Sequence, residues 1–182
     1  MFDLTQPHTL SADDQALAKT YALHRQTAKV ALGIRDGKYS SRPGVDLHLD
    51  GTKSEIAFAR IVGQEPHQID TAAGDGGHQD YVVQGIRVSL KSVQMGKRLL
   101  LIPPKQWPPQ SDITILYLLD DDRVSPLGWA TTEYLIAHCE RKSFGHGRPP
   151  CWAMPIDLLL PMHDLQAAFE DGMAAMARAD AA

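Results

Sequence analysis

The chain has 182 residues, of which 43% are hydrophobic and 22% are charged, and its formal net charge is -4. This composition predicts a single domain, residues 1–182, with a sizeable core. It excludes a protein that is basic as a whole, although a local positive cleft for nucleic acid remains compatible with it.

Cysteine content and apolar runs indicate the compartment. Cys139 and Cys151 are the only cysteines, which gives no disulfide framework. No apolar run approaches the length of a membrane span, and residues 1–5 lack the basic flank and apolar core of a secretory signal. We therefore expect no membrane partner and a location in the reducing cytoplasm.

The first predicted helix covers residues 11–34. Ser11 provides an N-cap, and Asp13 and Asp14 place negative charge at the positive end of the helix dipole. Small and apolar residues then recur at helical spacing, namely Leu17, Ala18, Tyr21, Ala22, Ala28 and Ala31. Residues 38–45 contain Ser, Arg, Pro and Gly, a composition that predicts a loop.

A second helix is predicted over residues 52–63, because Thr52-Lys53-Ser54-Glu55 has the form of a capping box and Gly63 is a suitable end. One stripe of this helix would face the core and consists of Glu55, Phe58, Ala59 and Val62. Glu55 therefore either caps the helix or points toward a site as a further acid. Sequence alone favours the capping interpretation.

A β-hairpin is predicted over residues 80–91, with Gln84-Gly85 as its two-residue turn, because glycine accepts positive φ. Side chains alternate across each strand, so the apolar face carries Tyr81, Val83, Ile86, Val88 and Leu90. The other face carries Asp80, Val82, Arg87, Ser89 and Lys91. A carboxylate, a hydroxyl and an amine gathered opposite an apolar face indicate a site. Residues 71–79, rich in glycine, predict a turn that leads to Asp80.

Further strands are predicted at residues 99–102, 113–119, 124–130 and 151–154, and further helices at 131–137 and 164–179. The three aspartates at 120–122 predict a solvated turn. The near-continuous apolar run at 113–119 is typical of a strand at the centre of a sheet. The fold class is therefore α/β or α+β, with a mixed central sheet flanked by helices and additional N- and C-terminal helices.

Three features together resemble the PD-(D/E)xK nuclease superfamily: the helix with Glu55, the approach Gly76-Gly77-His78-Gln79-Asp80-Tyr81, and the triplet Ser89-Leu90-Lys91. In that family an acid opens one strand, an acid-x-lysine triplet lies on the next, and the preceding helix frequently adds a glutamate. The resemblance covers residues 52–91 and implies a restriction-endonuclease-like core. Ser89 departs from the pattern, because the family usually has Asp or Glu there.

The resemblance implies a metal-dependent nuclease that hydrolyses phosphodiester bonds, with DNA as the expected substrate, in a restriction, repair or phage-type role. It implies Mg²⁺ or Mn²⁺ held by Asp80, Glu55 and the backbone carbonyl of Leu90. Lys91 would stabilise the attacking hydroxide or the transition-state charge, and Ser89 would position a water. A homodimer is expected by family analogy alone.

Nucleic acid would be contacted by basic residues around this region. His78 and Arg87 lie on the polar face of the hairpin, and Lys97 and Arg98 follow it. They would bind phosphates, although a solvated charge cluster or an ion pair with an acid is an alternative interpretation of each.

Two other functions remain open. A hydroxyl brings no charge to a hard cation, so Ser89 is compatible with a catalytically degenerate relative that binds nucleic acid or a protein partner without cleavage. The third hypothesis is an unrelated α/β scaffold whose polar hairpin face only meets solvent.

Overall fold

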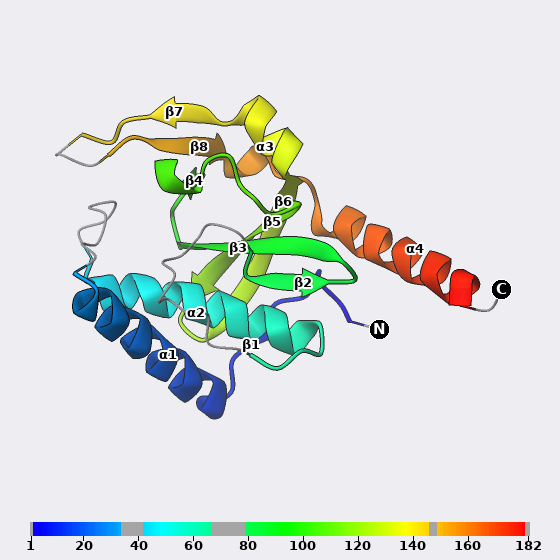
Figure 1. The fold of residues 1–182 in the computed structure, drawn as a ribbon, viewed down its shortest axis with the longest axis horizontal. Coiled ribbons are helices and arrows are strands. Elements are labelled where there is room, and N and C mark those ends of the chain that lie inside the picture. The colour runs from blue at the N-terminus through cyan, green and yellow to red at the C-terminus, as the bar shows by residue number, and fades with distance from the viewer. Residues whose placement is uncertain (1, 34–41, 67–78, 146–148, 181–182) are drawn as a thin grey trace.

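A computed structural model describes residues 2–33, 42–66, 79–145 and 149–180, the last of these by backbone alone from residue 172 onward. Figure 1 shows the arrangement, with a central sheet between a layer of helices and a second, smaller sheet. The elements are β1 (His8–Thr9), α1 (Ala12–Ala31), α2 (Gly44–Ile61), β2 (Tyr81–Val83), β3 (Ile86–Gln94), β4 (Leu99–Ile102), η2 (Pro104–Gln106), β5 (Ile113–Asp120), β6 (Arg123–Thr131), α3 (Thr132–His138), β7 (Glu140–Lys142), β8 (Cys151–Pro155), η3 (Ile156–Leu158) and α4 (Met162–Asp180).

The central sheet has five strands in the order β1-β6-β5-β3-β2. β3 and β5 are parallel, whereas the other neighbours are antiparallel, so the sheet is mixed. β5 lies in the middle, and Ile115, Leu116 and Tyr117 are all buried, as expected for a strand covered on both faces. The predicted mixed α/β class and the central position of this strand are confirmed.

Each face of the central sheet has its own core. On one face, residues such as Val88 and Ile115 pack with Phe58 of α2 and Phe169 of α4. On the other face, Leu116 packs with residues of the second sheet (order β4-β8-β7) and of α3. Figure 1 shows α1 and α2 on one side of β3, and β4, β8, β7 and α3 on the other. The site region is therefore positioned by both layers.

The hairpin forms as its sequence predicts. Gln84 and Gly85 have φ of 52° and 81°, the two positive values that a two-residue turn of this kind requires. The register pairs Tyr81 with Val88 and Val83 with Ile86. Tyr81 is 3% exposed whereas Val82 is 46% exposed, so the alternation of buried and open faces is confirmed.

The predicted start of the second helix is wrong. α2 begins at Gly44, eight residues before Thr52, with Pro43 as its N-cap. Thr52 lies in the helix interior, where its hydroxyl donates to the carbonyl of His48 at 2.5 Å. Glu55 is therefore far from the helix N-terminus and cannot cap it. The N-cap at Ser11 is confirmed, because its Oγ accepts from the Asp14 amide at 3.1 Å.

The second sheet pairs strands that are distant in the sequence. Leu100 lies opposite Met154, and β7 adds to the other edge of β8. The strands at 99–102 and 151–154 are confirmed, but their pairing and β7 were not predicted. No helix among the described residues combines the length and the apolar character needed to cross a membrane.

Candidate functional site

Asp80 stands at the entrance to β2 and turns its side chain onto β3. Its amide donates to the carbonyl of Val88 at 2.8 Å. Its carboxylate accepts from the Leu90 amide at 2.5 Å and from the Ser89 hydroxyl at 3.4 Å. At Leu90, the edge of β3 beyond the end of β2 is therefore hydrogen-bonded to the Asp80 side chain instead of to the backbone of a neighbouring strand.

This contact gathers potential cation ligands along one strand edge. The amide and carbonyl of one strand residue point to the same side of the strand. Because the Leu90 amide meets the Asp80 carboxylate, the Leu90 carbonyl is also directed to the edge that Asp80 covers. Two of the three predicted metal ligands therefore lie on the same edge.

Ser89 and Lys91 occupy alternate positions of β3, so they share a face of the sheet. On β5, Thr114 lies opposite Ser89 and Leu116 lies opposite Lys91. Both side chains of the triplet are half-buried. Among the described residues, no hydrogen bond or ion pair involves the Lys91 ammonium, although its charge acts on Glu55.

Two contacts locate α2 relative to the hairpin. In its first half, the Asp50 carboxylate lies 3.3 Å from the side-chain amide of Gln94 in β3. Just beyond its end, Gln64 donates to the carbonyl of Val82 in β2 at 3.0 Å. α2 therefore runs past β3 toward β2, and Glu55 lies between these two points of contact.

Glu55 is buried and bound by an arginine that the sequence did not single out. Arg25 of α1 donates from Nη1 to Glu55 Oε1 at 2.9 Å and from Nη2 to Oε2, with side chains only 9% and 10% exposed. The fork of the guanidinium thus engages both carboxylate oxygens. A signal was present, because Arg25 continues the buried stripe of small residues at Ala18 and Ala22.

Four charged side chains, those of Arg25, Glu55, Asp80 and Lys91, influence the pKa values of Glu55 and Arg25. Burial raises the pKa of the Glu55 carboxyl to about 6, and Asp80 adds to this rise while Arg25 and Lys91 oppose it. Burial works against the charge of Arg25, but the hydrogen bonds and charge of Glu55 outweigh it, with a contribution from Asp80, so the pKa of Arg25 is raised. The charges of Asp80 and Lys91 thus act on Glu55, although no hydrogen bond or ion pair among the described residues joins Glu55 to either. α2 packs on the sheet face that carries Val88, whereas Lys91 shares the opposite face with Leu116.

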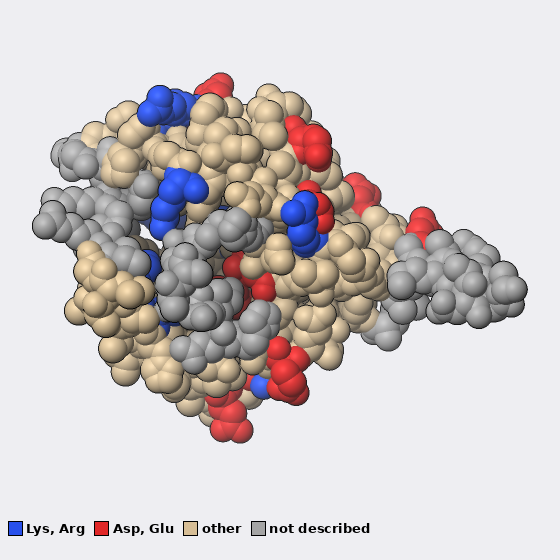
Figure 2. All heavy atoms as spheres, in the orientation of Figure 1, with Lys and Arg blue, Asp and Glu red and all other residues tan. Residues whose placement is uncertain are grey.

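The basic residues that were predicted to contact nucleic acid do not form one group among the described residues. His78 lies outside the described residues. Arg87 forms an ion pair with Asp112, the residue before β5, at 2.7 Å, and both are about half exposed. Lys97 and Arg98 are exposed in the turn between β3 and β4. Figure 2 shows the Lys and Arg side chains of this face as separate groups, with acidic side chains near its centre.

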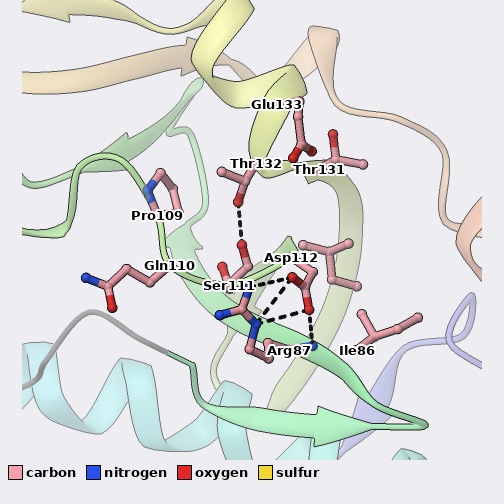
Figure 3. A pocket seen from close by; sticks show the side chains of 10 residues that line it. Ile86, Arg87, Pro109, Gln110, Ser111, Asp112, Thr131, Thr132 and Glu133 are labelled. Atoms are coloured by element: carbon pink, nitrogen blue, oxygen red, sulfur yellow. Dashed lines mark hydrogen bonds and ion pairs between the residues drawn. The ribbon is translucent and has the colours of Figure 1, made fainter.

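The Arg87–Asp112 pair borders an open groove of about 580 Å³. Figure 3 shows the pair on one side of the groove and residues 131–133 on another. The Asp112 carboxylate also accepts from the Arg87 amide at 2.8 Å. Across the groove, the Thr132 hydroxyl donates to the Ser111 carbonyl at 2.5 Å. The groove includes Ile86 and Arg87 of β3, but the charge of Arg87 is already paired with that of Asp112.

The donor set suits only a lightly held cation. In the ranges that the structure describes, no group of three or more His, Cys, Asp or Glu side chains could hold a metal ion. Asp80 and Glu55 supply two carboxylates, and Leu90 supplies a carbonyl. Mg²⁺ is commonly bound by one or two carboxylates together with waters and substrate phosphates. Asp80 and the Leu90 carbonyl are donors of this kind, whereas both oxygens of Glu55 already accept from Arg25.

Comparison of the chain with protein-family models, with curated proteins and with solved structures finds no match. The fold and the positions of its side chains are therefore the basis for assigning a function.

Proposed function

We propose that the protein is a metal-dependent nuclease that hydrolyses phosphodiester bonds, with DNA as the substrate, in a restriction, repair or phage-type role. Its core would be restriction-endonuclease-like. The observation that carries the proposal is the contact of Asp80 with Ser89 and Leu90, which joins the first acid to the triplet that ends in Lys91. The electrostatic interaction of Glu55 with both Asp80 and Lys91 supports it.

Each residue has a role in this reaction. A divalent cation would supply Lewis-acid polarisation of the scissile phosphate and of the attacking water. Asp80 and Glu55 would hold that cation, with the Leu90 carbonyl beside them. The compact Lys91 ammonium would stabilise negative charge as it develops on the phosphate oxygens. Ser89 would accept or donate a hydrogen bond to the water and so orient it.

A second candidate function is a nuclease-like module that binds nucleic acid or a protein partner without cleavage. Two observations favour it. Ser89 brings no charge to a hard cation. Arg25 already engages both oxygens of Glu55, so neither carboxylate oxygen is fully open to a metal ion.

A cleavage assay tests the proposal. Plasmid, linear and single-stranded DNA and RNA are incubated with the protein and Mg²⁺ or Mn²⁺, and again with EDTA. We expect metal-dependent cleavage of DNA that falls by a factor of about 10²–10³ in Asp80→Ala and in Lys91→Ala, because each removes an interaction with the reacting phosphate or its cation. Asp121→Asn in the β5–β6 turn and Lys19→Ala on the surface of α1 are matched controls that should cleave normally.

The alternatives give different results in the same series. Binding of DNA without cleavage, with gain of metal binding in Ser89→Asp, would favour the degenerate module. Cleavage that persists in both Asp80→Ala and Lys91→Ala would place the activity elsewhere and contradict the proposal. Absence of both binding and cleavage would favour an unrelated scaffold.

A further inference from the structure

The cation nearest to the candidate site is part of the protein itself. Arg25 reaches Glu55 from α1, a helix that lies outside the region of family resemblance. Its guanidinium occupies Oε1 and Oε2 together, and its Nε is buried with no partner in the described part of the chain. Arg25 and Glu55 are therefore each other's principal ion-pair partner.

The charges of the cluster are balanced in the free protein. Glu55 and Asp80 carry the negative charges, and Arg25 and Lys91 carry the positive ones, since Ser89 replaces the acid that the family pattern would add. Arg25 also interacts electrostatically with Asp80, so its charge acts on both acids. From these four side chains, a divalent cation would therefore meet no net negative charge.

We propose that Arg25 is an internal counter-cation that a divalent metal ion has to displace from Glu55. This inference rests on the proposed function, because it concerns the same two carboxylates. It assigns to α1 the control of metal affinity: the site holds metal weakly while Arg25 remains on Glu55, and tightly once that guanidinium has left.

Arg25 could instead orient Glu55 as a metal ligand. The sign of the change in metal affinity on replacing Arg25 separates that role from the proposed one. Groups that orient a metal ligand are usually carboxylates, carbonyls or water, and their removal weakens metal binding. A guanidinium next to the ligand instead repels a dication, so its removal should strengthen metal binding. The direction of change on replacing Arg25 therefore distinguishes competition from orientation.

The experiment measures Mn²⁺ binding directly, without any substrate, on the full chain. Free Mn²⁺ is followed by electron paramagnetic resonance for the wild type, Arg25→Met and Arg25→Lys. We expect the Kd of Arg25→Met for Mn²⁺ to be lower by about tenfold or more, because one unit of positive charge next to a dication is removed. Arg25→Lys keeps that charge and should remain close to the wild type.

Thermal unfolding gives a second readout, since Arg25→Met leaves Glu55 buried without its partner. Mn²⁺ should raise the Tm of Arg25→Met more than that of the wild type, because the metal ion replaces the missing cation. If Arg25→Met is unfolded without metal, Mn²⁺ should restore its circular dichroism spectrum. Adding Asp80→Asn to Arg25→Met should remove both effects.

The outcomes are distinct. If the wild type binds Mn²⁺ and Arg25→Met binds it no more tightly, or is unfolded and not restored by it, the inference is overturned while the nuclease proposal stands. If neither the wild type nor Arg25→Met binds Mn²⁺, both are overturned. Tighter binding that depends on Asp80 supports the displacement of Arg25.

Discussion

Two arginine–carboxylate pairs in this molecule have similar geometry and different surroundings. Arg25 and Glu55 meet at 2.9 Å between two packed helices, with side chains 9% and 10% exposed. Arg87 and Asp112 meet at 2.7 Å at the rim of a groove, with side chains 49% and 43% exposed. The comparison teaches that contact distance says little about energy, since water screens the second pair and is nearly excluded from the first.

The largest expected difference concerns the free energy of unfolding. Glu55→Leu should lower it by about 3–5 kcal/mol, because it leaves the Arg25 guanidinium buried with neither a counter-charge nor a hydrogen-bond acceptor. Asp112→Asn is the exposed control, and it should cause only a small fraction of that loss, because Arg87 stays hydrated. Urea unfolding of the three proteins measures both effects.

Replacing both charges of the Arg25–Glu55 pair at once tests whether the buried unpaired charge causes the loss of stability. Arg25→Met combined with Glu55→Leu should be much closer to the wild type than Glu55→Leu alone is, because no charge remains buried. Equal loss of stability in Glu55→Leu and Asp112→Asn would show that burial does not separate the two pairs.

The pairs should also differ in the sign of their pH dependence. The ordinary pKa of 4.5 for Glu55 rises to about 6 in the folded protein, so the folded state binds this proton more readily than the unfolded chain. The free energy of unfolding should therefore fall by about 2 kcal/mol as pH rises from 4.5 through 6, relative to the Arg25→Met/Glu55→Leu variant. Urea unfolding across this pH range measures it, and a flat difference would contradict it.

Asp112 should act in the opposite direction. Hydrogen bonds from the side chain and the amide of Arg87 lower the pKa of its carboxyl. Its contribution to stability is therefore present above the ordinary aspartate range and is lost as pH falls through the lowered pKa. The contrast in sign follows from burial, which dominates at Glu55 and is minor at Asp112.

The smallest expected effect is that of salt. At about 1 M NaCl, where the Debye length is about 3 Å, the stability difference between the wild type and Asp112→Asn should disappear. The difference for Glu55→Leu should persist, because a buried pair is screened much less. Loss of both differences in the same salt titration would show that the Arg25–Glu55 pair is also exposed to solvent.

The parts of the fold that local chemistry specifies could be predicted from the sequence. The hairpin followed from its alternation and from the glycine of its turn, and the start of α1 followed from Ser11. The start of α2 was missed because the Thr52-to-Glu55 spacing imitates a capping box. Pro43, Gly44 and the first-turn Asp46 are the signals that mark the true start.

Only the part of the candidate site that lies within the hairpin could be predicted from the sequence. Asp80, Ser89 and Lys91 lie within one hairpin, so their proximity follows from strand pairing. Arg25 and Glu55 lie on different helices and are thirty positions apart in the sequence. No local pattern specifies which residue a buried carboxylate will contact at that separation. The pairing of β4 with β8 was missed for the same reason, because tertiary packing decides it.

The parallel pairing of β3 with β5 has a consequence for the order of folding. The chain between them includes β4, whose own partner β8 begins only at Cys151. Ends of a parallel pair are brought together only after the connecting segment has crossed one face of the sheet, and such distant closures are slow. During synthesis, the face of β3 that carries Lys91 therefore gains its covering layer only after β8 has been made.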